Sequence, residues 1–202
     1  MIFNAQYQQH PETPDGDLFK RDWIKITDKF PNQVSRGRLI ISFDPAASTA
    51  ETADYTAISV VYSTEEGHYV LSAERGRWDF ETLVYKALTE AKKYEDYDIT
   101  FIVENSSSGI SLIQILKKAN FICIPAKARL DKMSRVAYVL PIIHQGRLLI
   151  VDIEGKNSWV EPYINEIVSF PNGKFDDQVD SLVHALYWAE PIVNPQGKIY
   201  LF

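Results

Sequence analysis

The chain has 202 residues, of which 46% are hydrophobic and 24% charged, so disordered and fibrous classes are excluded. A single cysteine, Cys123, rules out an intrachain disulfide and indicates a buried strand residue in a protein of the reducing cytoplasm. The net charge of −6 argues against a nucleic-acid coat protein but not against a nuclease, because metal sites gather acidic side chains. No apolar stretch reaches the roughly 20 residues that cross a bilayer, and the N-terminus lacks a signal-peptide pattern.

The first part of the chain predicts an arm followed by three strands. Residues 1–37 lack sustained periodicity but carry large apolar side chains, so we expect an arm or linker that docks on a domain of residues 38–202. Residues 39–43 form a short apolar run typical of a central strand, which Pro45 ends because proline has no N–H for the ladder. Two β-rich runs complete an antiparallel meander: residues 56–62 and 68–73.

The rest of the chain alternates between helical and strand patterns. Residues 80–91 repeat apolar side chains at helical spacing after the N-cap candidate Asp79, and residues 99–103 form another buried strand. The elements expected next are a helix (110–119), a strand (121–124), a helix with a kink at Pro141 (134–144), a strand (148–151) and helices 159–170 and 176–190. An antiparallel set followed by β–α units predicts an α/β fold, in which helices cover both faces of a mixed sheet.

Acidic side chains recur at positions that such a sheet would bring together. They are Asp44 after the first buried strand, Glu104 after a later one, and Asp176, Asp177 and Asp180 at the start of the last helix. Ligand sites in open α/β sheets lie beyond the carboxyl ends of the strands. If the two strands are parallel neighbours, Asp44 and Glu104 lie side by side, and the last helix could bring its first turn to them.

This set of carboxylates predicts a metal site. Clustered carboxylates repel one another unless a cation neutralises them, and hard oxygen ligands favour Mg²⁺ or Mn²⁺. Two such ions about 4 Å apart would activate a water and stabilise the leaving oxygen of a phosphoryl displacement. We therefore predict Asp44, Glu104, Asp176 and Asp177 as metal ligands and catalytic residues. No histidine-rich or cysteine-rich zinc pattern competes with them.

Each acid also has a structural interpretation. Asp44 before a proline is a common turn former, Glu104 could bond a loop backbone, and one of Asp176 and Asp177 could be only an N-cap. Asp180 follows these two at i+4 and i+3, where like charges destabilise a helix, and such violations tend to mark functional sites. The sequence does not separate Asp176 from Asp177; we place Asp176 first and keep Asp180 as an accessory candidate.

Other polar residues are secondary candidates. A basic loop before the kinked helix could hold a DNA phosphate backbone, or it could be a solvated charged face. Its cationic residues are Lys127, Arg129, Lys132 and Arg135. Asp54 could face the site across the hairpin, although a turn residue is the simpler interpretation. His184, one turn beyond Asp180, is an accessory candidate whose alternative is a satisfied structural histidine.

The ordered set resembles the C-terminal nuclease domain of phage terminase large subunits, a ribonuclease H-like family. The resemblance rests on residues 40–46, 54–58, 101–105 and 175–182, together with Lys132, Arg135 and Gly146. Residues 3–11 also look like the segment that joins the packaging ATPase to the nuclease in that family. No single motif is specific, but each acid falls on its expected element.

The resemblance implies a ribonuclease H-like fold and a metal-dependent endonuclease that cuts concatemeric viral DNA during genome packaging. Asp44, Glu104 and the pair Asp176 and Asp177 would bind two Mg²⁺ or Mn²⁺ ions. The implied partners are double-stranded DNA and the terminase small subunit, the portal or a separate ATPase domain, in the cytoplasm of a phage- or prophage-bearing bacterium. No G-x-x-x-x-G-K-S/T loop occurs, so we expect a nuclease-only piece, either a fragment or a truncated prophage gene, that does not hydrolyse ATP.

Two other functions fit parts of the pattern. A different ribonuclease H-like enzyme, such as a junction resolvase or a transposase core, would share the acid layout. It would differ in substrate, because resolvases prefer branched DNA. A non-catalytic packaging module or decayed prophage remnant is the third candidate, against which the intact acid set argues.

Overall fold

The computed structural model describes residues 18–30, 37–46, 54–126 and 131–189, and the backbone of residues 192–193 and 199–200. The strands are β1 (Lys25–Thr27), β2 (Arg38–Asp44), β3 (Thr56–Ser63), β4 (His68–Gly76), β5 (Ile99–Glu104), β6 (Ile122–Ala126), β7 (Leu148–Val151), β8 (Ile192–Val193) and β9 (Ile199–Tyr200). The helices are α1 (Phe80–Lys93), α2 (Ser107–Lys118), α3 (Lys132–His144), α4 (Val160–Ser169) and α5 (Asp177–Ala189), with 3₁₀ turns η1 (Arg21–Trp23) and η2 (Ile153–Gly155).

Seven strands form one mixed sheet in the order β1-β7-β4-β3-β2-β5-β6. The pairs β2–β3 and β3–β4 are antiparallel, while β2–β5, β5–β6, β4–β7 and β1–β7 are parallel. The predicted α/β fold with a three-strand antiparallel meander joined to parallel strands is therefore confirmed. β8 and β9 pair with each other in a separate two-stranded sheet.

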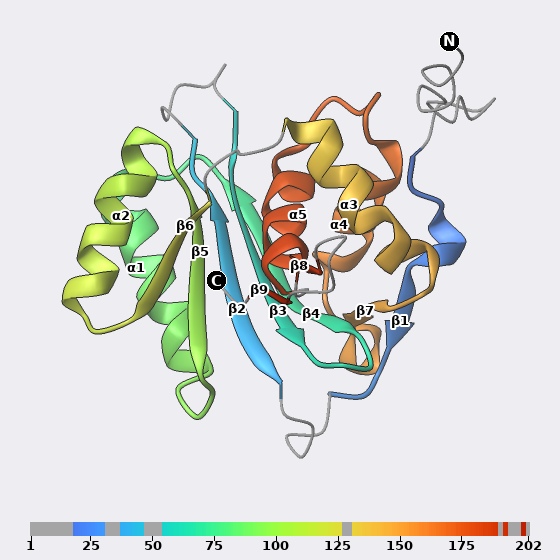
Figure 1. The fold of residues 1–202 in the computed structure, drawn as a ribbon, viewed down its shortest axis with the longest axis horizontal. Helices are drawn as coiled ribbons and strands as arrows, with labels where there is room; N and C mark the ends of the chain where they lie inside the picture. The colour runs from blue at the N-terminus through green and yellow to red at the C-terminus, as the bar shows by residue number, and fades with distance from the viewer. Residues whose placement is uncertain are drawn as a thin grey trace, which may run out of the picture.

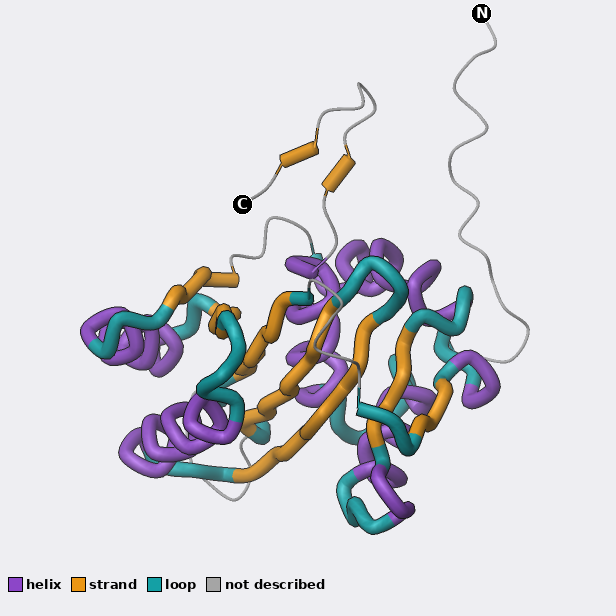
Figure 2. The backbone as a smooth tube through the Cα atoms, turned by 90° about the horizontal axis from the view of Figure 1, so that it is seen from below, coloured by secondary structure: helices purple, strands orange, loops and turns teal. Residues whose placement is uncertain are grey.

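Helices cover both faces of the sheet. Figure 1 shows α1 and α2 together on one side and α3, α4 and α5 on the other, and Figure 2 shows the two helical layers from below. Side chains of β2 alternate between the two layers, with Ile40 packed in the α3–α5 core and Ile41 in the α1–α2 core. This alternation follows from the pleat, and it explains why a strand buried on both faces reads as a continuous apolar run.

Local capping explains where several helices begin. The Asp79 carboxylate accepts a hydrogen bond from Thr82 N–H (2.8 Å) at the start of α1, which confirms the predicted N-cap. The Asp131 carboxylate does the same for Ser134 N–H (3.0 Å) at the start of α3. α3 continues past Pro141, which lies inside the helix.

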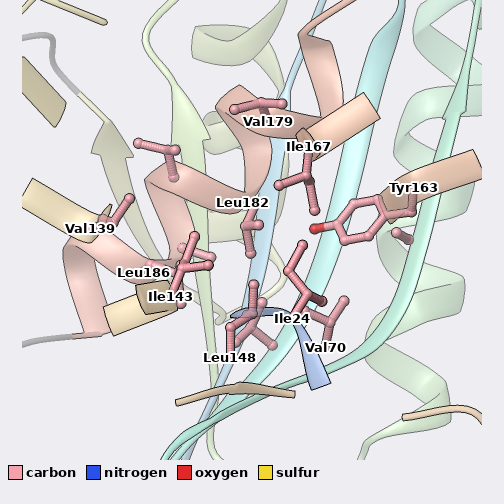
Figure 3. Close-up of a cluster of buried hydrophobic side chains, with 14 of the residues drawn as sticks. Ile24, Val70, Val139, Ile143, Leu148, Tyr163, Ile167, Val179, Leu182 and Leu186 are labelled. Carbon is pink, nitrogen blue, oxygen red and sulfur yellow. The ribbon is translucent and has the colours of Figure 1, made fainter. Parts of the chain in front are cut away.

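The larger core lies between the sheet and the α3–α5 layer (Figure 3). α3 contributes Val139 and Ile143, and α5 contributes Leu182 and Leu186. Tyr163 of α4 is fully buried in this cluster, and its hydroxyl group lies 3.1 Å from the Ser59 hydroxyl. The layer that carries the last helix is therefore fixed to the sheet by both apolar packing and a buried hydrogen bond.

Part of the expected arm packs against the domain. Phe19 and Ile24 are buried in the α3–α5 core, and β1 extends the sheet beside β7. Residues 1–17 lie outside the described residues, so the predicted boundary between arm and domain stays a prediction. The β1 pairing had no signal in the sequence, because a three-residue strand is too short for a periodic pattern.

Cys123 lies in β6, where burial raises the pKa of its thiol to about 11, as expected for a packed rather than a reactive cysteine. Within the described part of the chain, no helix is long and apolar enough to cross a membrane.

Candidate active site

The two acids at the strand ends meet. β2 and β5 are parallel neighbours with Phe43 opposite Val103, so Asp44 and Glu104, the next residues, end the two strands side by side. Their carboxyl groups are hydrogen-bonded to each other, which requires a proton on one of them. Burial and the neighbouring Glu104 together raise the pKa of Asp44 well above its usual value.

A close backbone contact fixes the position of Glu104. The first turn of α2 packs against the end of β5, and a Cβ atom on Gly109 would lie 2.0 Å from the Glu104 carbonyl oxygen. Only glycine permits that approach. The Ser106 hydroxyl caps α2 by accepting from Gly109 N–H at 3.2 Å, so the chain turns from strand to helix directly after the acid.

Asp180 is the α5 acid that acts most strongly on this pair. Its charge raises the pKa of Asp44 more than the charge of Asp177 does. One of its carboxylate oxygens, Oδ1, is buried without a hydrogen-bond partner among the described residues. Burial also raises the pKa of Asp180 itself, although Lys132 opposes the shift. The residue expected as an accessory therefore stands closer to the centre of the cluster than the sequence indicated.

Asp177 is held in place by the start of β3. It is the first residue of α5, it is buried, and its Oδ1 accepts a hydrogen bond from Tyr55 N–H at 3.1 Å. Burial, followed by the charge of Glu166, raises the pKa of Asp177 to about 6. Asp54 is exposed, and its charge contributes to this shift from the neighbouring position.

Asp176 precedes α5 and faces Lys132 rather than the Asp44–Glu104 pair. The Lys132 ammonium group forms ion pairs with Asp176 and with Asp180 Oδ2, the second at 2.6 Å. Burial disfavours the charge of Lys132, but hydrogen bonds to the two carboxylates outweigh it and raise its pKa. Arg135 lies 3.8 Å from Asp180 and is buried.

These contacts bear on the predicted DNA-binding loop. Lys132 and Arg135 neutralise the acids of α5, so neither presents a solvated cationic surface in this arrangement. Lys127 and Arg129 lie outside the described residues. The DNA-binding role of this loop stays a prediction.

His184 lies one turn after Asp180 and is 2% exposed. Burial and the charge of Arg135 lower the pKa of His184 to about 4, so the imidazole is neutral near pH 7. Its Nε2 atom is buried and has no hydrogen-bond partner in the part of the chain that the structure describes. The ring is therefore not the fully satisfied structural histidine that was the alternative interpretation.

Glu166 of α4 was not singled out by the sequence. Its carboxylate accepts hydrogen bonds from both the backbone N–H and the side-chain amide of Gln178, each at 2.7 Å, and it pairs with Arg75. A carboxylate at a helix N-terminus stabilises unpaired N–H groups. Glu166 therefore anchors the start of α5, and no short-range sequence pattern could find it, because its partners come from two other elements.

The donor set suits a hard divalent cation. Asp44 and Glu104 can share only one proton between them, and Asp180 keeps a buried oxygen without a hydrogen bond from any described residue, so a cation would satisfy all three. In the described ranges, no three Asp, Glu, His or Cys side chains are yet arranged to hold an ion. The Lys132 ammonium group already satisfies Asp176 and Asp180, which explains why the acids are not drawn together.

A surface hollow of about 800 Å³ lies elsewhere, at the other end of the same strands. It is lined by Ile99 and Thr100 at the start of β5 and by Ile122 at the start of β6, whereas Glu104 ends β5. The hollow is therefore separated from the acids by the length of a strand.

Three comparisons place the chain among known proteins. The model of the Terminase RNaseH-like domain family matches residues 41–187. The nuclease of the large terminase from thermophilic phage G20c, solved with bound magnesium, superposes with a TM-score of 0.61 at 14% identity, over 86% of this chain and 98% of that one. No curated protein sequence matches.

Two further solved structures share the fold. The human cytomegalovirus terminase nuclease domain, soaked with manganese and bound to an inhibitor, has a TM-score of 0.62 at 12% identity, over 86% of this chain and 95% of that one. The large terminase of another thermophilic bacteriophage has a TM-score of 0.62 at 14% identity; the match covers 86% of this chain and 43% of that one. The ribonuclease H-like architecture predicted from the sequence is thereby confirmed, and the chain belongs to the terminase ribonuclease H-like domain family.

Proposed function

We propose that the chain is a metal-dependent DNA endonuclease that cuts concatemeric viral DNA during phage genome packaging by two-metal phosphodiester hydrolysis. The observation that carries the proposal is the meeting of Asp44 and Glu104 at the ends of two parallel strands, with Asp180 of α5 close by. Membership of the terminase family and the magnesium and manganese named for two structural neighbours support it.

Asp44, Glu104 and Asp180 would hold the divalent ions, with Asp177 beside them and Asp176 as a further candidate ligand. When bound, two Mg²⁺ or Mn²⁺ ions would activate the attacking water and stabilise the charge of the leaving oxygen. The chain itself supplies rigidity: Tyr55 and Glu166 fix the start of α5, and Lys132 and Arg135 balance its negative charge. This assignment places Asp180 ahead of Asp176.

The partners follow from the same proposal. The substrate is double-stranded DNA, and the site works beside a packaging ATPase, with the small subunit and the portal as further partners in the bacterial cytoplasm. The longer phage large terminase was also solved in complex with ADP, and this chain spans 43% of it, which fits a nuclease that acts with a separate ATPase domain.

A plasmid-cleavage assay tests the activity and the site together. Wild-type protein is incubated with supercoiled DNA in Mg²⁺, Mn²⁺, Ca²⁺ or EDTA, beside Asp44→Ala and the matched variant Asp98→Ala, whose carboxylate lies near the opposite end of β5. We expect cleavage in Mg²⁺ or Mn²⁺ that disappears in EDTA and in Asp44→Ala, while Asp98→Ala cuts normally.

The outcome also separates the rival functions. Strong preference for a branched junction over linear and supercoiled duplex would favour a resolvase-type enzyme. Full activity of Asp44→Ala would contradict the metal site. No cleavage with any metal, from protein whose circular dichroism shows the folded state, would favour a non-catalytic packaging module.

A further inference from the structure

A cationic side chain lies on the same face of the sheet as the candidate metal ligands, two strands away. Asp44 of β2 pairs with Ala57 of β3, which pairs with Arg75 of β4, and directly paired residues point to the same face. Neighbouring strands are about 4.8 Å apart, so Asp44 and Arg75 are separated by about 10 Å across the sheet. α5, which carries the other acids, packs across β2, β3 and β4 (Figure 1).

Arg75 belongs to a cluster of cations stacked on aromatic rings. Its guanidinium group lies 5.0 Å from the centre of the Tyr55 ring and 4.8 Å from that of Phe175. Arg77 lies 4.0 Å from the Tyr55 ring, and Lys174 Nζ lies 5.0 Å from the Phe175 ring. The two rings meet edge to face at 5.1 Å. We refer to these five residues as the arginine–aromatic shelf.

The shelf is built on the segments that hold the acids of α5. Tyr55 donates its N–H to Asp177, and Phe175 lies two residues before Asp177 in the chain. A ligand that bound the shelf would therefore lie directly beside the candidate site, on its β4 side. The opposite side of the site is formed by Glu104 and β5.

Charge distinguishes the shelf from the basic residues next to the acids. Lys132 and Arg135 are engaged with Asp176 and Asp180. On the shelf, Glu166 neutralises Arg75, and Arg77 and Lys174 bring further positive charge to the edge of the rings. In a chain of net charge −6, a local cationic surface is what could attract a polyanion.

The dimensions and chemistry fit a nucleic-acid backbone. About 10 Å corresponds to roughly three phosphate charges along one strand of a duplex, which carries one per about 3.4 Å of axis. Guanidinium groups bind phosphate oxygens in a planar, bidentate manner, and stacking on a ring holds them in place before the ligand arrives. We propose that the arginine–aromatic shelf binds the phosphate backbone of the DNA strand that passes the candidate metal site. This proposal rests on the proposed nuclease function and names the surface that positions its substrate.

The test separates binding from cleavage. Binding of a short fluorescein-labelled duplex is measured by anisotropy in Ca²⁺ over a series of salt concentrations, for wild-type protein and for Arg77→Ala combined with Lys174→Ala. Loss of two phosphate contacts should lower the slope of log K against log salt by about 2 and weaken binding at low salt by about tenfold. The matched control is Lys117→Ala with Lys118→Ala, which removes two charges at the end of α2.

A second pair of variants tests the stacking without changing the charge. Tyr55→Leu removes the ring under Arg77 but keeps the backbone N–H that binds Asp177, whereas Tyr55→Phe keeps the ring. We expect Tyr55→Leu to weaken DNA binding several-fold and Tyr55→Phe to bind like wild type. Thermal melting of every variant checks that the fold is retained.

The outcomes keep the two proposals apart. If wild type binds DNA but does not cut it in Mn²⁺, and the double shelf variant binds more weakly than the α2 control, the shelf is supported and the nuclease function is not. If the double shelf variant binds with the affinity and salt slope of wild type, the shelf proposal is wrong whatever the cleavage result. Absence of DNA binding by folded wild-type protein also overturns it.

Discussion

The two faces of the sheet differ in what they bury. The α1–α2 face encloses an almost wholly apolar cluster that includes Phe43, Phe101 and Leu112. The α3–α5 face buries polar and charged groups among its apolar side chains. These are Ser42, Ser59, Arg135, Glu166, Asp177, Gln178, Ser181 and His184.

Buried polar groups are costly unless they are paired, so their concentration on one face has to be explained. Some are paired: the Ser181 hydroxyl bonds that of Ser59 at 2.5 Å, and Glu166 bonds Gln178. Others, such as His184 Nε2 and Asp180 Oδ1, have no hydrogen bond within the described ranges. Incomplete pairing next to the strand-end acids indicates that the α1–α2 face provides stability, whereas the α3–α5 face is shaped for chemistry.

The largest expected effect separates two acids that share Lys132. Asp180→Asn should lower DNA cleavage in Mn²⁺ by more than about a hundredfold, because residues that only support metal ligands already account for roughly 10- to 100-fold. Asp176→Asn should cost much less, since its carboxylate is half exposed and acts mainly through Lys132. Initial rates of plasmid nicking measure both, and equal losses in the two variants would contradict the ranking of Asp180 ahead of Asp176.

On the opposite face, a change should alter stability and leave the chemistry intact. Leu112→Ala removes a fully buried side chain from the α1–α2 cluster and should lower the free energy of unfolding by about 2–5 kcal/mol. Urea denaturation measures the loss, and cleavage per folded molecule at low temperature should match wild type. A large fall in that rate would show that the two faces are not functionally separate.

The pH dependence of stability should carry the signature of His184. Its pKa is about 6.5 in the unfolded chain and about 4 in the folded protein, so the unfolded state takes up the proton first as the pH falls. His184 therefore makes the protein less stable between about pH 6.5 and 4, by about 3 kcal/mol across the window. Asp44 and Asp177, whose pKa values are raised, act in the opposite direction without metal, because protonation stabilises the folded form.

The contribution of His184 is isolated by comparing variants. Urea denaturation of the metal-free protein at about pH 7 and pH 5, on either side of the unfolded-state pKa, is compared between wild type and His184→Gln. Wild type should lose stability relative to the variant as the pH falls, whereas a constant difference would show that His184 is not buried in the neutral form.

The sheet and the Asp44–Glu104 pair were predictable because both depend on short-range patterns. An apolar run that ends in an acid marks the end of a buried strand, and the end of a strand is where a ligand site forms. The rotation of α5 is not encoded in this manner. Which of Asp176, Asp177 and Asp180 faces β2 depends on Tyr55 and Glu166, and therefore on contacts across the fold.

The same limit explains the basic residues. Lys132 and Arg135 read as a cationic loop in one dimension, but the packing of α3 against α5 turns them toward acids. Arg75 and Arg77 read as the polar end of a strand, and only the register of β3 and β4 reveals that they share a face with Asp44 or a ring with Tyr55.

The Lys132 bridge changes how the site would acquire its ions. An ammonium group already occupies the position between Asp176 and Asp180 that a divalent ion would approach. Loading is then an exchange of one cation for another and not the filling of an empty cage. An exchange responds to the ratio of competing cations more than to the amount of any one of them, so the protein stays charge-balanced at this point in both states.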